Sequence, residues 1–502
     1  MPKDGFDQRE VAKRRLAGER GFVAPTDAPT RICLGYPSPY AVAMSSLGFQ
    51  TIFRELGARD DVLVDRAFLP DDRAAIDALK AAREPLVSYA TLRRVADFPI
   101  VALSFAYELE IGGLIDFLTL SGIPVLSTDR RKGDPIVVIG GPITFSNPIP
   151  LSPFADAIVF GEADQAIHGV VAAAQSGESR NAKLGALARV PGVFIPARGL
   201  VPPPCLAADD ARLPAFASIV TDETELAGMF LIEAERGCHR GCTYCVMRRS
   251  TNGGMRLVAP ERILGLIPCD ARRVGLVGAA VSDHPRICDI LRGVVDAGRE
   301  VSLSSLRADR LNAEFVGLLA KGGHKTLTVA SDAASERLRE TIQRKIHERH
   351  LIRAATLARD AKMTRLKTYM MVGLPGETHD DIDELVRFTR ELAKILPVAM
   401  GIAPFVAKRN TPLDGAPFEA IDAIEEKLAT IRRGLAGIAE VRPTSARWAY
   451  VEYRLAQGGP EAGLAAMRAH QAGGSFAAYR SAFDENSIAA PRPLRVVGGR
   501  LE

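Results

Sequence analysis

Three closely spaced cysteines near the middle of the chain constrain its fold more than any other feature. Cys238, Cys242 and Cys245 have the spacing Cys-x3-Cys-x2-Cys, within a stretch whose glycines and arginine predict an exposed turn. Three thiolates so close together can reach one metal centre from a single loop. One such loop supplies no fourth thiolate, so an iron–sulfur cluster held here keeps one iron open to bind and activate a second molecule. Spacing this regular predicts a metal site.

Other interpretations of these cysteines are weaker. Structural zinc normally takes four protein ligands, and no matching Cys or His pair follows at zinc-finger spacing. His239 is adjacent to Cys238 and therefore poorly placed to share its metal. A disulfide framework conflicts with an odd total of seven cysteines and with the lack of secretory features. Three unrelated buried thiols conflict with the exposed turn that Gly237 and Gly241 predict.

Length and composition indicate a water-soluble enzyme-sized chain of two or three domains. The chain has 502 residues, of which 47% are apolar and 25% charged. Its net charge of +4 is too balanced to indicate nucleic acid or an anionic membrane surface as a partner. The first residues are charged throughout and resemble no signal peptide, and no apolar run approaches the ~20 residues of a membrane span. A cytoplasmic location is therefore expected, which suits free thiolates.

The N-terminal third alternates between short apolar strands and helices. Residues 1–29 form a polar lead-in, and residues 30–175 carry this alternation, which predicts a doubly wound parallel sheet. Ligands of such sheets bind at the carboxyl ends of the strands. Gly140, Gly141 and Gly161 fall at these ends, where glycine lets the backbone approach a bulky ligand or simply makes a tight turn.

The rest of the chain divides into four segments by composition. Residues 176–228 contain proline clusters that break any periodicity, so a linker is predicted there. Strand–helix alternation resumes over residues 229–412, with six strand–helix units. Residues 413–485 have helical patterns rich in Ala, Glu and Arg, and residues 486–502 are predicted to be a loose tail. The predicted fold class is therefore α/β with a helical C-terminal region.

The cysteine loop, with Tyr244 just before its last cysteine, resembles the cluster loop of the radical S-adenosylmethionine (SAM) superfamily. The resemblance implies a 4Fe–4S cluster whose open iron binds the amino and carboxylate groups of SAM. An electron from the cluster then cleaves SAM to methionine and a 5′-deoxyadenosyl radical. The resemblance also implies that residues 229–412 form a (β/α)6 partial TIM barrel with a helical cap, and that flavodoxin or ferredoxin donates the electron.

Candidate SAM contacts follow from this resemblance at the ends of the predicted barrel strands. Gly278-Ala279-Ala280 stands where the family usually has Gly-Gly-Glu, so the missing glutamate leaves the SAM amino group to main-chain carbonyls. Arg307 suits a carboxylate because its donors form a planar fork, although it can equally be a salt-bridging arginine. Asp332 can equally be a helix cap. The candidates are Tyr244, Gly278, Ala279, Ser304, Arg307, Asp332, Gly373 and Leu374.

Residues 30–175 resemble the cobalamin-binding domain that precedes many radical SAM cores, in stretches such as GGPITFSNP and FGEAD. The resemblance makes Gly140, Gly141 and Gly161 candidate cobalamin contacts. Cobalamin domains with a lower axial ligand carry Asp-x-His-x-x-Gly, but here no histidine precedes His168. Either cobalamin binds with no protein histidine on cobalt, or the domain no longer binds it.

Together these features predict a radical SAM enzyme that modifies an unactivated carbon, with cobalamin-dependent methylation as one version of the reaction. A methylthiotransferase-like enzyme is an alternative, but that family needs a second three-cysteine cluster, and only Cys33 precedes residue 205. A non-catalytic iron–sulfur redox module is another, but it normally uses four cysteine ligands. Nothing in the sequence indicates the substrate.

Overall fold

The computed structural model is a mixed α/β fold with parallel sheets, in agreement with the predicted class. The predicted loose tail, residues 486–502, lies outside the described part of the chain. No helix in the described part is long and apolar enough to cross a membrane. The structure describes residues 6–177, 179–199, 201–250 and 254–484.

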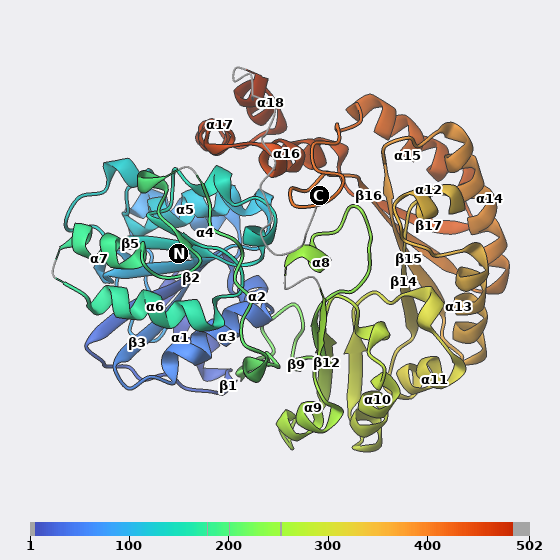
Figure 1. Ribbon diagram of the computed structural model, residues 1–502, viewed down its shortest axis with the longest axis horizontal. Helices are drawn as coiled ribbons and strands as arrows, with labels where there is room; N and C mark the ends of the chain where they lie inside the picture. Colours follow the sequence, from blue (N-terminus) through green and yellow to red (C-terminus); the bar gives the residue numbers. More distant parts are fainter. Residues whose placement is uncertain (1–5, 178, 200, 251–253, 485–502) are drawn as a thin grey trace, which may run out of the picture. The chain divides into compact units, whose positions relative to one another are not determined.

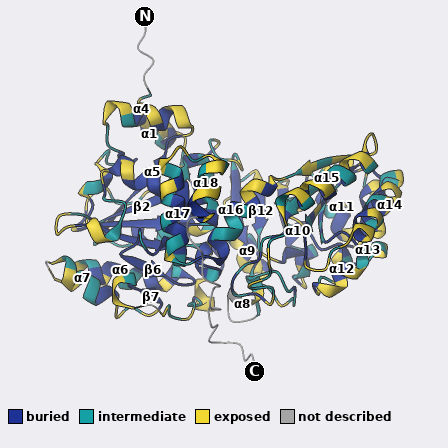
Figure 2. Cartoon of the chain, turned by 90° about the horizontal axis from the view of Figure 1, so that it is seen from above, coloured by how far each residue is buried: buried dark blue, intermediate teal, exposed yellow. Residues whose placement is uncertain are grey.

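The chain forms two compact units (Figure 1). The first contains Met1–Met229 and Gly458–Glu502, and the second contains Phe230–Gln457. The strands of the sheet in the first unit are largely buried, whereas helices such as α14 (His379–Ile395) expose their outer faces (Figure 2). This burial explains why the strands have continuous apolar sequences.

The first unit is built on a six-stranded sheet in the order β3-β2-β4-β5-β6-β7. All neighbours pair in parallel except β7, which is antiparallel to β6. Because β3 and β4 lie on opposite sides of β2, the chain order reverses between β2 and β4. The strands are β2 (Thr30–Pro39), β3 (Val62–Leu69), β4 (Ile100–Ser104), β5 (Ile136–Gly140), β6 (Ala157–Val159) and β7 (Val193–Phe194).

Helices and short 3-10 turns connect these strands. The polar lead-in contains α1 (Gln8–Ala17), which Asp7 caps and whose buried Arg15 bonds to Tyr89 Oη at 2.9 Å. The helices that follow the sheet strands are α3 (Leu47–Gly57), α4 (Arg73–Ala82), α5 (Ile111–Ser121) and α6 (Ala163–Gln175).

Residues 176–228 are part of the first unit and not the free linker that the sequence predicts. They contain α7 (Arg180–Leu187), the sheet strand β7, and β8 (Ile219–Val220), which pairs with β1 (Arg20–Gly21). Two-residue strands are too short to leave an alternation pattern, and prolines conceal them further. Backbone hydrogen bonds therefore hold this segment where composition predicts a loop.

The second unit carries two sheets that follow one another along the chain. The first has the order β13-β12-β9, and the second is the parallel sheet β14-β15-β16-β17. A parallel bridge between Leu306 and Val329 links the end of β13 to β14. The strands are β9 (Met229–Glu233), β12 (Arg273–Val277), β13 (Glu300–Leu303), β14 (Thr326–Asp332), β15 (Arg365–Val372), β16 (Val398–Pro404) and β17 (Ala439–Pro443).

Helices follow the strands of the second unit, as the predicted strand–helix alternation requires. Apolar residues at helical spacing bury one face of each helix against the strands. The helices are α9 (Pro260–Leu266), α10 (Ile287–Asp296), α11 (Ala313–Lys321), α12 (Glu336–Thr341), α13 (Glu348–Asp360) and α14.

The helical C-terminal region is divided between the two units, which corrects the single helical cap predicted for residues 413–485. The second unit keeps α15 (Ile421–Leu435), the strand β17 and α16 (Ala446–Gln457), whereas α17 (Pro460–Gln471) and α18 (Phe476–Asp484) belong to the first. Helical periodicity indicates that one face of a helix is buried, but it does not identify the segment that covers this face.

Candidate functional site

The cysteine loop follows a short hairpin in which β10 (Glu235–Gly237) pairs antiparallel with β11 (Met255–Leu257). Cys242 is buried, and Cys238 and Cys245 are half-buried. Burial raises the pKa of the Cys238 and Cys245 thiols, and the neighbouring cysteines raise it further, so the three thiols lie within electrostatic reach of one another. Among the described residues, no three Cys, His, Asp or Glu side chains are arranged to hold a metal ion. The loop therefore brings the three thiols near one another, but in the described residues their side chains do not converge on one metal position.

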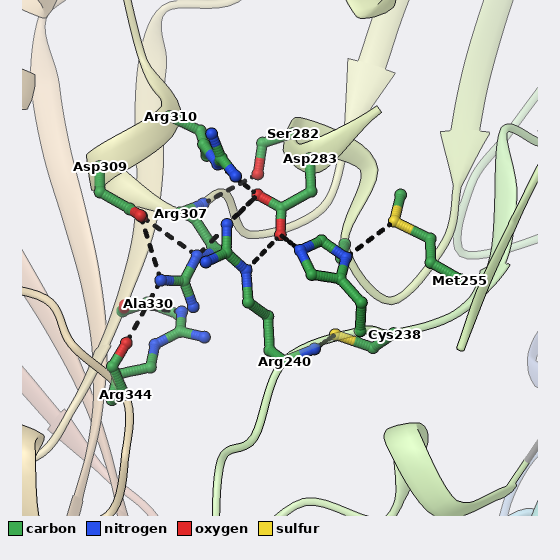
Figure 3. Close-up of polar contacts among 12 residues, drawn as sticks. Cys238, Arg240, Met255, Ser282, Asp283, Arg307, Asp309, Arg310, Ala330 and Arg344 are labelled. Carbon is green, nitrogen blue, oxygen red and sulfur yellow. Dashed lines mark hydrogen bonds and ion pairs between the residues drawn. The ribbon is translucent and has the colours of Figure 1, made fainter. Parts of the chain in front are cut away.

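One anchor of the cysteine loop is Asp283, at the end of the 3-10 turn Val281–Asp283 that follows β12. Its carboxylate accepts two hydrogen bonds from Arg240, at 2.7 and 3.1 Å, and one from Arg310 at 3.1 Å (Figure 3). Burial alone would raise the pKa of Asp283, but the bond and charge of Arg240 outweigh burial and lower it. His239 Nε2 lies 3.7 Å from the same carboxylate. The sequence analysis missed Asp283, because nothing local marks an aspartate as the partner of distant arginines.

A second anchor lies at the other end of the loop. Tyr244 donates its hydroxyl to Asp332 Oδ2 at 2.7 Å, and Arg344 Nε lies 2.6 Å from the same oxygen. The Asp332 backbone is left-handed, with φ of 69°, which costs a non-glycine residue about 1–2 kcal/mol. The two predicted SAM contacts Tyr244 and Asp332 thus bind each other. Asp332 is not the alternative helix cap either, because Ser335 caps α12.

The predicted SAM contacts Gly278 and Ala279 lie at the end of β12, beside a carboxylate that the sequence analysis missed. Glu235 is completely buried and accepts a hydrogen bond from the Ala280 N–H at 2.6 Å. A Cβ on Gly278 would lie 2.3 Å from Glu235 Oε1, so the glycine leaves room for this carboxylate. The other oxygen, Oε2, is buried with no hydrogen-bond partner in the described part of the chain. Ala279 is exposed.

Glu235, on β10, places a buried carboxylate beside the Gly-Ala-Ala stretch. Burial raises its pKa to about 7. The sequence did contain a signal: Glu233 and Glu235 interrupt the apolar run that begins at Met229. Glu233 is satisfied by Arg236 at 2.7 Å, whereas Glu235 keeps one free oxygen.

Arg307 fits both of its predicted interpretations. Its guanidinium bonds to Asp309 at 3.1 and 3.2 Å, as a salt-bridging arginine does. Its Nη1 is nevertheless buried and has no partner among the residues the structure describes. Ser304 is exposed just beyond β13. A free carboxylate oxygen on Glu235 and a free guanidinium nitrogen on Arg307 are complementary to the ammonium and carboxylate of an α-amino acid.

The predicted adenine contacts Gly373 and Leu374 pack against α15 and the residues before it, and their contact with adenine stays a prediction. Leu374 is 3% exposed and belongs to a core cluster with residues of α15. Gly373 has a left-handed backbone, with φ of 84°, and a Cβ there would lie 3.0 Å from Glu419 Oε2. Its N–H donates to Glu377 at 2.8 Å. The turn after β15 therefore faces α15. A short sequence motif does not show which neighbouring element such a turn will contact.

The glycines predicted to contact cobalamin meet the backbone of their own chain. A Cβ on Gly141 would lie 2.6 Å from the Phe105 carbonyl oxygen, and a Cβ on Gly161 would lie 2.2 Å from that of Leu206. Both glycines have positive φ angles, of 108° and 93°. Gly140 ends β5 in ordinary contact with its neighbours. These contacts favour the tight-turn interpretation of Gly141 and Gly161, and cobalamin contact at the three glycines stays a prediction.

Two family models match the chain. One is described as radical SAM proteins, N-terminal, and covers residues 48–196; the other, the radical SAM superfamily, covers residues 232–389. The chain belongs to the radical SAM superfamily. This radical SAM chain is an enzyme, and membership of the superfamily implies SAM and a 4Fe–4S cluster.

Similar proteins have been identified by sequence. The radical SAM chain is 27% identical over 417 residues to the uncharacterized protein MJ0966 of Methanocaldococcus jannaschii, across 80% of this chain and 83% of that protein. It is 26% identical over 172 residues to a tRNA-2-methylthio-N(6)-dimethylallyladenosine synthase of Desulfitobacterium hafniense, across 31% of this chain and 38% of that one.

Two solved structures share the fold. One is the radical SAM methyltransferase TsrM from Kitasatospora setae, with a TM-score of 0.54 and 15% identity, across 76% of this chain and 75% of that one. The other is the cobalamin-dependent SAM radical enzyme OxsB, with a TM-score of 0.50 and 14% identity, across 82% of this chain and 56% of that one.

The Asp283 anchor leads to a first prediction. Asp283→Asn removes the charge that Arg240 and Arg310 share, and we expect the free energy of unfolding to fall by about 1.5–3 kcal/mol. Urea denaturation measures this change. The control is Asp289→Asn, which breaks exposed pairs with Arg286 and Arg292 and should cost less than about 1 kcal/mol. Equal losses in both variants would contradict the anchoring role.

Proposed function

We propose that Cys238, Cys242 and Cys245 hold a 4Fe–4S cluster, and that the enzyme cleaves SAM reductively and removes a hydrogen atom from an unactivated carbon of its substrate. In this proposal β9 and β12–β16 are the six strands of a partial TIM barrel. The cluster supplies the electron that splits SAM into methionine and a 5′-deoxyadenosyl radical. The observation that carries the proposal is a three-cysteine loop in the same unit as two buried polar atoms, Glu235 Oε2 and Arg307 Nη1, that have no hydrogen-bond partner among the described residues.

The chain's own residues would perform three tasks in this reaction. Arg240 and Tyr244 fix the two ends of the cysteine loop through Asp283 and Asp332. Arg344 places a positive charge close to Cys242, at the centre of the loop. The loop is thereby held in place at both ends.

The methionine part of SAM would lie between the two unsatisfied groups. Glu235 Oε2, which has no partner among the described residues, would accept a hydrogen bond from the amino group of SAM, and Arg307 Nη1 would donate one to its carboxylate. Both atoms are shielded from bulk water, which strengthens their attraction to opposite charges.

The test is anoxic reconstitution of the full chain with iron and sulfide. The protein should take up about four irons per chain and, with SAM and dithionite, release equal amounts of 5′-deoxyadenosine and methionine. Fully loaded protein that binds SAM but forms no 5′-deoxyadenosine would contradict the proposal. Flavodoxin or ferredoxin is the proposed natural electron donor, in a cytoplasmic setting.

Cobalamin-dependent methylation is a second candidate, favoured by the fold shared with TsrM and OxsB. It requires a corrinoid on the N-terminal sheet. The space beside the candidate glycines Gly141 and Gly161 is occupied by backbone atoms of the same chain. Methylthiolation, suggested by the Desulfitobacterium hafniense relative, needs a second cysteine cluster. Cys33 is buried in β2 with no neighbouring cysteine in the sequence, so it does not begin one. We therefore propose hydrogen abstraction without cobalamin.

A further inference from the structure

The sheet of the first unit has a topological switch point between β2 and β4. Open α/β sheets bind ligands at such points, outside the carboxyl ends of the strands. The anionic part of the ligand normally lies at the N-terminus of the following helix, where main-chain N–H groups are free. In this chain that helix is α5, which follows β4 and the turn Glu108–Glu110.

A carboxylate of the chain itself already occupies this anion position. Glu110 is 7% exposed, and its Oε2 accepts the Ala106 N–H at 2.6 Å and lies 3.5 Å from the Tyr107 nitrogen. Its Oε1 faces the Ser38 hydroxyl, at the end of β2, at 3.5 Å. Glu108, a second acidic residue, is buried beside it. An incoming phosphate would find these backbone donors already taken.

Backbone contacts of the same chain also occupy the carboxyl ends of β2 and β6. A Cβ on Gly113 would lie 2.0 Å from the Pro37 carbonyl oxygen, so the start of α5 packs directly against the end of β2. Next to the end of β6, the Leu206 N–H donates to Phe160 at 3.0 Å and the Ala208 N–H donates to Glu162 at 2.8 Å. The segment around Leu206 therefore covers the carboxyl end of β6.

Helix α17 covers the loops that follow β4 and β5. His470 Nε2 lies 3.1 Å from Asp116 Oδ2 on α5. A Cβ on Gly463 would lie 1.8 Å from the Pro150 carbonyl oxygen, so α17 also touches the turn after β5 at van der Waals distance. Asn147 donates to the Gly458 carbonyl at 2.8 Å, which fixes the start of the helix.

We propose that the chain's own residues occupy the carboxyl edge of this sheet, where a ligand would bind, and that Glu110 takes the place of a ligand phosphate. The domain then acts as a scaffold and binds no cobalamin. Cobalamin carries a phosphate in its nucleotide tail, and the backbone donors at this edge that would bind it are already bonded to Glu110. The inference concerns the first unit alone and does not depend on SAM cleavage by the second.

Corrinoid binding by the full, anoxically reconstituted chain tests this inference. After incubation with hydroxocobalamin and gel filtration, the protein fraction should lack the visible corrinoid absorbance. Retention of one corrinoid per chain would overturn the proposal. SAM cleavage is measured on the same sample, so that loss of cleavage contradicts the proposed function while corrinoid retention contradicts only the present inference.

A variant tests the role of Glu110 directly. Glu110→Ala vacates the anion position, so inorganic phosphate should then raise the Tm of the variant by about 2–4 °C and leave the Tm of the natural chain unchanged. Glu110→Gln keeps a hydrogen-bond acceptor in place and serves as the control that phosphate does not stabilise. Equal stabilisation of all three proteins, or of none, would overturn the assignment, and corrinoid binding by the natural chain decides the case if Glu110→Ala does not fold.

Discussion

Cys242→Ala is expected to reduce bound iron to background and to abolish the formation of 5′-deoxyadenosine from SAM. Three protein ligands are the fewest that hold a 4Fe–4S cluster with one open iron, so loss of one leaves two. Cys242 is the buried member of the trio, and its Sγ lies 3.8 Å from the Gln343 carbonyl, so water does not readily replace it. Iron analysis and product quantification after reconstitution measure both effects.

Cys288→Ala is the matched control for that experiment. Cys288 is a half-buried thiol in α10 of the same unit, and it lies far along the chain from the cysteine loop. This variant should keep about four irons per chain and full SAM cleavage. If Cys242→Ala kept its iron and its activity while folding normally, the cluster assignment would be wrong.

Glu235→Gln is expected to raise the Kd for SAM by about 10- to 100-fold, since a hydrogen bond to a charged group contributes about 1.5–3 kcal/mol. Glutamine preserves the acceptor for the Ala280 N–H but removes the charge that attracts the SAM ammonium. Calorimetric titration of cluster-loaded protein with SAM measures this loss. Affinity for an analogue that lacks the amino group should be the same in both proteins.

The pH dependence of SAM binding gives this prediction a second readout. The pKa of Glu235 is raised to about 7, so the residue is mostly protonated at pH 6 and mostly ionised at pH 8. Only the ionised form attracts an ammonium group, so SAM affinity should rise with pH across this window in the natural chain. It should be nearly constant in Glu235→Gln.

The control for Glu235→Gln is Glu233→Gln, which changes a similarly buried carboxylate already paired with Arg236. It should leave both the SAM affinity and its pH profile unchanged. A Kd change of the same size in both variants would mean that Glu235 acts through strand packing and not through contact with SAM.

The contacts of Arg240 with Asp283 and of Tyr244 with Asp332 have a structural consequence for the cysteine loop. Asp283 and Asp332 follow two different strands of the second unit, and each bonds to a different part of the loop. A loop fixed at both ends loses little conformational entropy when it binds a ligand. This preorganisation explains why arginine and tyrosine accompany the cysteines in the loop.

The sequence alone was sufficient for the local features of this enzyme. Cysteine spacing and strand–helix alternation are short-range properties, so they predicted the three-thiol loop and the α/β class without tertiary information. The sequence also located the Gly278 strand end correctly, because glycine and alanine there indicate close packing.

Only the tertiary structure decided which distant residues meet. It paired Glu235 with the Gly278 strand end, gathered arginines around Asp283, turned Gly373 toward α15, and assigned α17 to the first unit. Each of these outcomes depends on a contact between segments far apart in the chain. Periodicity shows that a residue is buried, but charge pairing and close packing across strands determine what it is buried against.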